Sequence, residues 1–452
     1  MKPIKQELED RGLLFQSSND KLFEEFDAGW KNFYCGFDPT ADSLHLGNFI
    51  GFMVAIHLMR RWNKYTALTG WATGMIWDPG WKDAERTFLS EQDLDNNQIA
   101  ISNQITNMLS HLNSINISKN INKSLKKWDI NNNYLLKEKD NIYSSFKYDF
   151  VNNKDFYKNM WYLDFLREVW KYITINVMMS KDTVKKRIED PKQSISYTEF
   201  SYMLLQGYDF AKMYKDDNML LQIWGQDQWG NLVTGTEIIR KKYNWESYAL
   251  TWPLITDSSW KKFGKSEWNA MFLDKNKTSP YFIYQYFMNT ADTDISKYLK
   301  MLTLIETEEI DEIVSKHMEH PENRWGQEIL AYKVVEIIHW KIEANLALKI
   351  TEFMFGKWDK LETLKTLSDE ELKTFQNAMW GFDYIEENLF ESIVKSELAK
   401  SNWDARNSVK SGAIYINEEK IEDFNFNVWD KFIDNKFIFI RKGKKNLKLI
   451  LK

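Results

Sequence analysis

The order of elements near the N-terminus limits the possible folds of this chain more than any other feature. An apolar strand-like run, "NFYCGF" (32–37), leads into a polar turn, "DPTADSLHLGN" (38–48). An apolar helical stretch follows, "FIGFMVAIHLMRRW" (49–62), and then a second strand-like run, "KYTALTG" (64–70). A strand, a helix and a strand in this order predict a parallel βαβ unit. The sequence therefore predicts an α/β fold built on a parallel sheet.

The rest of the chain divides by pattern into regions of different character. Residues 115–150 are rich in Asn and Lys, which predicts an exposed insertion, and residues 155–215 are helical in pattern. "NMLLQIW" (218–224) predicts a buried strand that enters a polar turn. After about residue 275 the pattern is helical, and 385–452 predicts two short helices followed by strands. At roughly 150 residues per domain, the 452 residues suggest about three domains.

Composition excludes several classes of protein. No apolar run reaches the roughly 18 residues needed to span a bilayer, and the charged start "MKPIKQELEDRGLL" does not fit a signal peptide. The single cysteine, Cys35, rules out an internal disulfide, and the six scattered histidines form no zinc-binding pattern, so no metal site is expected. We expect a soluble, cytoplasmic protein with no membrane partner. A net charge of −5 argues against general coating of nucleic acid, but not against a local basic patch.

Two stretches are suited to phosphate binding. The turn at 38–48 opens a helix, and helix N-termini bind phosphates through free N–H groups and the helix dipole. His45 and Asn48 stand three apart there, so both can face one ligand, and Gly47 leaves room for a nucleotide against the backbone. "KKFGKS" (261–266) is a loop with three lysines that suits a polyanion such as pyrophosphate. Taken alone, His45 is equally a packed or capping residue, and the lysine loop a solvated charge run.

A third motif, "YMLLQGYD" (202–209), places polar groups on one face of a helix. Tyr202, Gln206 and Asp209 stand at i, i+4 and i+7, which is the spacing of one helical face. A phenol, an amide and a carboxylate on one face can bind a small polar ligand. The same pattern also fits an exposed polar stripe, so the motif alone leaves both interpretations open.

Together these stretches resemble the bacterial-type tyrosyl-tRNA synthetases, which are class I aminoacyl-tRNA synthetases. "YCGFDPTADSLHLGN" resembles that family's HIGH signature, and "SISYTEFSYMLLQGYDF" resembles its tyrosine-pocket helix. "LQIWGQDQWGN" resembles its LQIGGSDQWGN segment, and "KFGKSE" its KMSKS motif. "LFESIVKSELAKSNWDARNSVKSGAIYINEEKI" resembles an S4-like RNA-binding module. Five motifs in the family's order cover nearly the whole chain except the Asn/Lys-rich insertion.

The resemblance implies a division into domains. It implies a Rossmann-type catalytic domain over 1–257, with an inserted helical and dimer-forming segment at about 115–200. The KFGKS loop and an α-helical anticodon-binding-type domain would follow over 258–360. A linker over 361–384 would lead to a small α+β S4-like RNA-binding domain over 385–452. Because the family is homodimeric, the resemblance also implies a homodimer.

The resemblance further implies the reaction and the residues that serve it. L-Tyrosine would be activated with ATP to tyrosyl-adenylate and transferred to the 3′ end of tRNA(Tyr), with Mg²⁺ accompanying ATP and no tightly bound cofactor. The residues expected to bind tyrosine are Tyr34, Asp78, Tyr202, Gln206, Asp209 and Gln228, of which Tyr34 and Asp209 would bind the phenolic hydroxyl. The residues expected to contact phosphates or pyrophosphate in catalysis are Thr40, His45, Asn48, Lys82, Arg86, Lys262, Lys265 and Ser266. The residues expected to line the ATP site are Gly36, Asp38, Gly47, Gln222, Gly225, Asp227 and Lys265.

Some positions depart from the family pattern or stay open. Asn48 replaces the second histidine of HIGH, Gln226 replaces a serine, and "NNKDF" (152–156) stands where the family has NNYDW. Basic clusters at 122–128 and 441–448 are expected to bind tRNA phosphates, or else to form solvated lysine faces. Cys35 is expected either to touch the ribose or to be a packed thiol.

Tryptophan stands at many positions where glycine is expected. The chain has 20 tryptophans and only 18 glycines, about 4% glycine against a usual share of about 7%. Trp62 follows a helix at the point where glycine normally ends one, and Trp245 and Trp403 each follow Asn, where an Asn-Gly turn is usual. The tryptophans that replace family glycines are Trp62, Trp71, Trp77, Trp81, Trp170, Trp224, Trp260, Trp268 and Trp403.

Our hypothesis is that most of these residues are glycines whose UGA codons were translated as tryptophan. Trp229, by contrast, matches a family tryptophan, and Trp128, Trp325 and Trp429 cannot be assigned. An indole at 224 would occupy space meant for adenine, since tryptophan buries about 150–250 Å² where it packs. The alternative is a synthetase that is genuinely rich in aromatic residues, as its Phe and Tyr content also suggests.

Two other functions remain as alternatives. One is an inactive RNA-binding relative that kept the fold, with the tryptophans as decay. Decay should also have removed His45, Asp209 and Lys265, which are present. The other is a tryptophanyl enzyme, from which the "YMLLQGYD" helix and the S4-like tail point away.

Overall fold

A computed structural model gives the structure of the chain in two compact units. It describes residues 1–76, 89–115, 146–190, 195–254, 256, 270–356, 360–379, 381–383, 389–423, 428–443 and 446–452. The first unit contains Met1–Thr278 and Thr290–Leu330, and the second contains Ser279–Asn289 and Ala331–Lys452. Each unit has its own β-sheet. Because these units are defined by contacts alone, the domain limits expected from the sequence stay predictions.

The first unit is built on a six-stranded sheet in the order β1-β6-β5-β2-β3-β4. Neighbouring strands from β6 to β4 are parallel, and the edge strand β1 runs antiparallel to β6. The strands are β1 (Gln16–Ser17), β2 (Asn32–Phe37), β3 (Lys64–Thr69), β4 (Lys147–Asn152), β5 (Met219–Gly225) and β6 (Tyr248–Trp252). The predicted strands at 32–37, 64–70 and 218–224 and the predicted parallel unit are thereby confirmed.

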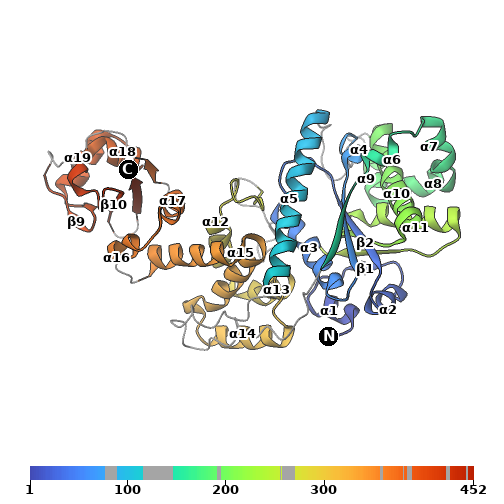
Figure 1. Cartoon of the computed structure of the whole chain (residues 1–452), viewed down its shortest axis with the longest axis horizontal. Coiled ribbons are helices and arrows are strands. Elements are labelled where there is room, and N and C mark those ends of the chain that lie inside the picture. The colour runs from blue at the N-terminus through green and yellow to red at the C-terminus, as the bar shows by residue number, and fades with distance from the viewer. Residues whose placement is uncertain are drawn as a thin grey trace. The chain divides into compact units, whose positions relative to one another are not determined.

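Helices cover both faces of this sheet (Figure 1). Helix α3 (Leu46–Met59) packs on one face against β3, β5 and β6, and it is buried almost all round, which explains its continuous apolar sequence. Helices α10 (Tyr197–Asp217) and α11 (Trp229–Tyr243) pack together on the other face, against β5. Tyr34 and Leu68 from the sheet and Phe210 and Ile238 from these helices share that core. This is the layered α/β arrangement that the sequence predicts.

The remaining helices of the first unit surround this core. They are α1 (Ile4–Asp10), α2 (Lys21–Asp27), α4 (Trp71–Gly74), α5 (Glu91–Ile115), α6 (Lys154–Tyr157), α7 (Tyr162–Glu168), α8 (Ile175–Met179), α9 (Asp182–Glu189), α13 (Asp292–Leu302) and α14 (Thr307–Glu319). Short 3₁₀ turns lie at Trp170–Tyr172, Gln226–Gln228 and Pro321–Asn323. Residues 116–145 of the expected insertion lie outside the described residues. Its last residues, 147–150, belong to the edge strand β4, which the sequence analysis did not predict, and most of them are exposed as expected.

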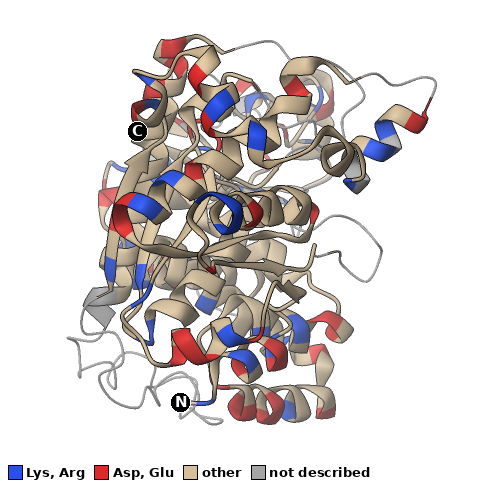
Figure 2. Cartoon of the chain, turned by 90° about the vertical axis from the view of Figure 1, so that its right-hand side faces the viewer, with Lys and Arg blue, Asp and Glu red and all other residues tan. Residues whose placement is uncertain are grey.

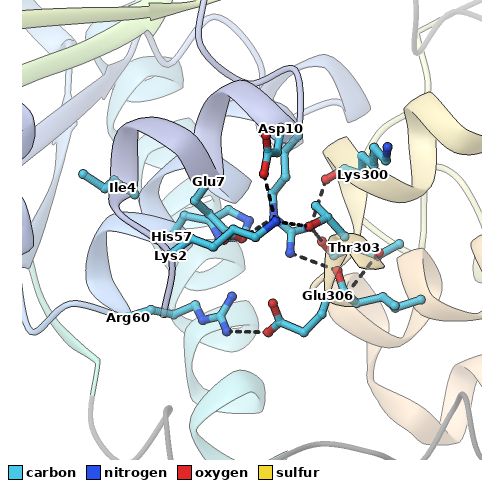
Figure 3. Close-up of polar contacts among 12 residues, drawn as sticks. Lys2, Ile4, Glu7, Asp10, His57, Arg60, Lys300, Thr303 and Glu306 are labelled. Carbon is cyan, nitrogen blue, oxygen red and sulfur yellow. Dashed lines mark hydrogen bonds and ion pairs between the residues drawn. The ribbon is translucent and has the colours of Figure 1, made fainter. Parts of the chain in front are cut away.

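A buried ionic cluster ties the N-terminal helix to α13 and its connection to α14 (Figure 3). The Arg11 guanidinium pairs with Glu7 and donates hydrogen bonds to the carbonyl oxygens of Lys300, Thr303 and Ile305. Lys300 lies in the last turn of α13, where carbonyl groups lack partners within the helix, so Arg11 satisfies part of that helix end. His57 of α3 lies against Glu7, and burial holds the pKa of His57 well below its usual value.

The second unit contains a five-stranded sheet in the order β7-β11-β10-β8-β9. Its strands are β7 (Phe382–Asp383), β8 (Ile414–Ile416), β9 (Glu419–Lys420), β10 (Phe437–Lys442) and β11 (Asn446–Leu451). Side chains alternate across β10, as the twofold period of a strand requires. Ile438 and Ile440 join a core with residues of the short helices, and Phe437 and Phe439 join a second core on the opposite face.

The helices of the second unit confirm the two short helices and the strands expected near the end of the chain. They are α12 (Pro280–Met288), α16 (Lys360–Lys365), α17 (Asp369–Ala378), α18 (Leu389–Lys395) and α19 (Asn402–Lys410), with a 3₁₀ turn at Val428–Lys431. The long helix α15 (Trp325–Phe355) begins in the first unit and is interrupted at Trp340, which has non-helical backbone angles. The expected turn at Asn402–Trp403 is wrong, because both residues lie in the first turn of α19.

Candidate active site

The carboxyl ends of the parallel strands surround a cavity of about 330 Å³. Strands β2, β3 and β4 follow one another in one direction along the sheet, and β5 and β6 lie on the other side of β2. Ligands of open parallel sheets bind at such a point, where the strand order reverses. The cavity contains ten of the residues predicted from the sequence: Gly36, Asp38, Thr40, His45, Gly47, Asn48, Tyr202, Gly225, Asp227 and Gln228.

The start of α3 forms one wall of this cavity. His45 is the N-cap residue, and its Nδ1 accepts a hydrogen bond from the Asn48 backbone N–H at 3.3 Å. The Asn48 side-chain oxygen in turn accepts from the His45 N–H at 3.0 Å, which completes a capping box. The capping interpretation of His45 is therefore confirmed, and both side chains lie at the cavity wall. The contact of His45 with a ligand stays a prediction. A Cβ at Gly47 would lie 2.9 Å from the His45 ring, so a larger residue here would displace that ring from its capping position.

A chain of hydrogen bonds leads from the cavity into the protein. The Tyr202 hydroxyl donates to Asp38 Oδ2 at 2.8 Å, and the Thr73 hydroxyl donates to Asp38 Oδ1 at 2.8 Å. The Asn153 side-chain nitrogen lies 3.3 Å from the Thr73 oxygen and 2.9 Å from Asp209 Oδ2. Asp38 follows β2, Thr73 lies in α4 after β3, and Asn153 follows β4, so three strand ends contribute to one network.

The inner end of this network is a group that we call the Asp209 cluster, made of Tyr34, Asn153, Tyr157 and Asp209. The Tyr157 hydroxyl donates to Asp209 Oδ1 at 2.8 Å, opposite the bond from Asn153. Burial raises the pKa of the Asp209 carboxyl to about 8, although both hydrogen bonds act in the opposite direction. Burial also raises the pKa of Tyr34, with a further contribution from the nearby Asp209 charge. The cluster is therefore a buried polar site at which charge is costly.

Several buried polar atoms of the site form no hydrogen bond with any described residue. They are the Tyr34 hydroxyl and both side-chain polar atoms of Gln206 and of Gln222. Unsatisfied buried groups cost about 1–3 kcal/mol each, so each of them requires an explanation, such as a water, an ion or a catalytic role. Tyr202, Gln206 and Asp209 are all buried on one face of α10, which excludes the exposed polar stripe.

Two tryptophans also line the cavity, Trp224 of β5 and Trp252 of β6. The Trp224 ring lies directly on the backbone of β2, since a Cβ at Gly36 would meet its Cζ3 at 2.8 Å. The Trp252 ring lies in the same way on Gly51 of α3, at 2.5 Å from the Cβ position. Cys35 lines the cavity wall and is buried, and burial raises the pKa of its thiol.

The predicted set is therefore placed in three groups. Tyr34, Gln206, Asp209 and Gln222 are buried beside the cavity residues already named. The residues outside the described ranges are Asp78, Lys82, Arg86, Lys262, Lys265 and Ser266. Sequence reasoning missed Thr73 and Tyr157, and it treated the 152–156 stretch only as a departure from the family. The available signal was the position of Thr73 and Asn153 just after strand-like runs.

Comparison with known proteins agrees with this geometry. Residues 30–356 match the model of the class I tRNA synthetases (W and Y), and residues 375–450 match the model of the tyrosine–tRNA ligase SYY-like C-terminal domain. The tyrosine–tRNA ligase of Streptococcus mutans is 40% identical over 448 residues, covering 98% of each chain. That of Streptococcus agalactiae is 39% identical over 444 residues, covering 97% of each chain. This chain belongs to the tyrosine–tRNA ligase family.

Solved structures support the same family. The mitochondrial tyrosyl-tRNA synthetase of Aspergillus nidulans, truncated at its C-terminus, superposes with a TM-score of 0.66 at 28% identity, covering 78% of this chain and 95% of that one. The enzyme of Coccidioides posadasii gives 0.63 at 26% identity, covering 77% and 92%. The predicted family and fold class of this tyrosine–tRNA ligase family member are thereby confirmed.

No group of three or more His, Cys, Asp or Glu side chains is placed to hold a metal ion within the described ranges. Among the helices that the structure describes, none has the length and hydropathy needed to cross a bilayer.

Proposed function

We propose that the cavity and the Asp209 cluster together activate tyrosine with ATP for transfer to tRNA(Tyr). The observation that carries this proposal is the buried Tyr34 hydroxyl, which has no described hydrogen-bond partner and lies near a carboxyl group held by Asn153 and Tyr157. An apolar amino acid would leave these groups unsatisfied. A phenol would satisfy them, because its hydroxyl can donate to Asp209 and accept from Tyr34.

The amino group of tyrosine would bind nearer the cavity. Tyr202, Gln206 and Gln228 are the described residues proposed for this role, with Asp78 outside the described ranges. Tyr202 is held in place by its hydrogen bond to Asp38, and Gln206 has two buried polar atoms available for a ligand. Tyrosine would thus lie between the Asp209 cluster and the cavity with its carboxylate directed toward the nucleotide.

ATP would occupy the cavity itself. We assign its ribose and phosphates to the walls formed by Gly36, Asp38, Thr40, His45, Gly47, Asn48, Gln222, Gly225 and Asp227. At the α3 N-terminus the Leu46 and Asn48 N–H groups already donate to Met271 and His45. The Gly47 N–H and the positive end of the helix dipole would therefore face the phosphate oxygens. We propose that Mg²⁺ enters bound to the phosphates of ATP, as is usual for this ion.

The reaction has two displacements. A tyrosine carboxylate oxygen attacks the α-phosphorus of ATP, the bond to the β-phosphate oxygen breaks, and pyrophosphate leaves. A ribose hydroxyl of the terminal tRNA adenosine then attacks the carbonyl carbon of the adenylate, and AMP leaves. No covalent bond to the protein is needed, so positioning and charge stabilisation supply the rate. Lys82, Arg86, Lys262, Lys265 and Ser266 would stabilise the charge on the leaving pyrophosphate.

The function is tested by amino-acid-dependent pyrophosphate exchange, followed by charging of tRNA(Tyr). Tyrosine, phenylalanine and tryptophan should be compared, with the chain as written and with a variant that carries glycine at 71, 77, 81, 224, 260 and 268. Exchange that depends on tyrosine alone is expected from the glycine variant. Two results would contradict the proposal. One is exchange that depends on tryptophan, and the other is that neither protein shows exchange with any of the three amino acids.

We propose a homodimer formed through the helices between β4 and α10. Large apolar side chains are exposed over this segment: Trp161, Tyr162, Leu163, Ile175, Met179, Ile188 and Tyr197. Light scattering of Leu163→Glu should give a monomer, whereas Met318→Glu, at an exposed position on α14, should leave a dimer. A dimer for both variants would exclude this interface.

We propose that the second unit contacts tRNA from its β10–β11 hairpin, in a cytoplasmic enzyme. Arg441 lies on β10 and stacks on the Tyr415 ring at 4.0 Å, and Lys448 lies on β11. Figure 2 shows acidic and basic residues interspersed along the helices, which suits local rather than general phosphate binding. The basic stretch at 122–128 lies outside the described residues.

A further inference from the structure

Three tryptophans adopt backbone conformations that favour glycine. Trp30, Trp62 and Trp340 have φ values of 62°, 64° and 72°. Side chains with a Cβ rarely adopt positive φ, and for a bulky residue it is a genuine outlier. Five of the other non-glycine residues with positive φ among the described ranges are Asn or Asp, which tolerate this region. Tryptophan has no such reason to be there.

Trp340 gives the strongest case. Its φ of 72° is combined with a ψ of 159°, and it interrupts helix α15 at this residue. This combination lies in a region of backbone space that is essentially restricted to glycine. The side chain is 41% exposed, so it is only partly packed.

Trp30 and Trp62 form a pair at the surface. Trp62 comes three residues after the end of α3, and Trp30 follows Gly29, which itself has a φ of 78°. The Trp30 N–H donates to the Trp62 carbonyl oxygen at 3.3 Å, and glycine would make the same bond. The two rings stack at 6.0 Å but are 67% and 48% exposed. The backbone at 30 and 62 therefore adopts the positive φ that glycine favours. Because both indole rings are largely exposed, they contribute little to the core.

We propose that the functional chain carries glycine at 30, 62 and 340, and also at 224, because its gene uses UGA as a glycine codon. UGA differs by one base from the tryptophan codon UGG and by one base from the glycine codon GGA, so a single change in decoding exchanges the two residues. It would also account for a chain with more tryptophan than glycine. The first three positions follow from backbone geometry, whereas 224 rests on the proposed function, because glycine there would clear the space beside Gly36 for adenine.

The other described tryptophans with known backbone conformation differ from Trp30, Trp62 and Trp340. Trp229 has ordinary helical angles (φ −49°, ψ −44°) at the start of α11, and it is assigned as true tryptophan. Trp245 follows Asn244, which itself takes the left-handed conformation, and Trp403 is helical. Backbone geometry thus gives no reason for glycine at 245 or 403. Trp77, Trp81, Trp260 and Trp268 lie outside the described residues. Glycine at 71 and 170 stays a prediction.

Reading the gene, and then the protein from its own cells by mass spectrometry, tests the proposal without any activity measurement. UGA codons at 30, 62, 340 and 224, UGG at 229, and glycine-bearing native peptides are the expected result. UGG codons at 30, 62 and 340, or native peptides that carry tryptophan there, would overturn it. Glycine peptides from a chain that shows no tyrosine-dependent exchange would overturn the proposed function but leave the decoding intact.

Thermal unfolding of the full chain gives a second test. Trp30→Gly, Trp62→Gly and Trp340→Gly should each raise the unfolding midpoint or leave it unchanged, because strain is removed. Trp229→Gly should lower it, because glycine is placed in an ordinary helical turn. A fall at 30, 62 and 340 as large as that at 229 would contradict the geometric argument.

Discussion

The Asp209 cluster and the neighbouring cavity are built on opposite physical principles. Under the proposed function, recognition in the Asp209 cluster would depend on side chains that are buried, polar and already bonded to one another, such as Asn153 and Tyr157 on the Asp209 carboxyl. In the cavity, recognition would depend on main chain at Gly36 and Gly47 and on polar side chains such as Asp227. The cluster would reject a ligand that lacks one hydroxyl, whereas the cavity would accept or exclude a ligand by shape and charge.

The two regions should therefore fail in different ways. A substitution in the cluster removes a hydrogen-bonding group and changes which amino acid is chosen. A large side chain in the cavity occupies volume and prevents nucleotide binding, whatever the amino acid.

The largest effect is expected from Asp209→Ala, which should abolish the preference for tyrosine over phenylalanine. A discrimination of about 10⁵-fold is already known for enzymes of this type, so this magnitude is not a new estimate. The measurement is kcat/KM for each amino acid in pyrophosphate exchange, in the glycine variant. Asp216→Ala removes an exposed carboxylate from the same helix and serves as the control. Unchanged selectivity in Asp209→Ala would show that the phenolic hydroxyl of tyrosine is not recognised by Asp209.

A smaller but still large effect is expected from Trp224→Gly in the chain as written. Removing the indole from the face of Gly36 should raise exchange by at least about 10²-fold, the scale on which a 1 Å misplacement already acts. Trp252→Gly also enlarges the cavity, but its ring lies on Gly51 of α3 and should give no such increase. Equal increases from both variants would show that the cavity responds to volume alone.

An intermediate effect is expected from Tyr157→Phe, which removes one donor to Asp209. The KM for tyrosine should rise about 2- to 10-fold, because Asp209 keeps its proton at neutral pH and a hydrogen bond between neutral groups contributes about 0.5–1.5 kcal/mol. Tyr208→Phe is a matched control, because that ring packs edge-on against Tyr157 at 5.5 Å. A KM increase for phenylalanine as large as that for tyrosine would assign Tyr157 a packing role instead.

The sequence predicted the parallel sheet well because its signals are local. The apolar run at 32–37, the turn and helix after it, and the strand at 64–70 each follow from patterns within about ten residues of chain. The position of the cavity could also be predicted from the sequence, since polar residues that follow parallel strands meet at one edge of a sheet. The edge strand β4 was missed although Tyr148 and Phe150 alternate with Lys147 and Asp149, because the whole 115–150 stretch was interpreted from its Asn- and Lys-rich composition.

The details of the Asp209 cluster could not be obtained in this way. Tyr157 reaches Asp209 from 52 positions away in the chain, and nothing local marks that contact. The backbone at Trp30 and Trp340 was equally hidden, because only the folded chain imposes left-handed angles there. At Trp62 the helix end gave a local signal, and there the expectation of a glycine-like position agrees with a φ of 64°.

The last effect concerns the pH dependence of stability rather than activity, and it again separates the cluster from the cavity. With the pKa of Asp209 raised by burial to about 8, the folded protein keeps a proton there that the unfolded chain releases above pH ~4. Stability should therefore fall as pH rises between about 4 and 8, by up to about 1.4 kcal/mol per pH unit, and level off above that. The Asp209→Asn side chain cannot ionise, so this variant should lose the slope. Its unfolding midpoint should therefore rise relative to that of the parent protein as pH increases. Asp227→Asn, at the cavity, should keep the parent slope. Parallel curves for the parent and Asp209→Asn would mean that the carboxyl is ionised in the folded protein throughout, and the contrast between a costly buried charge and an open cavity would then fail.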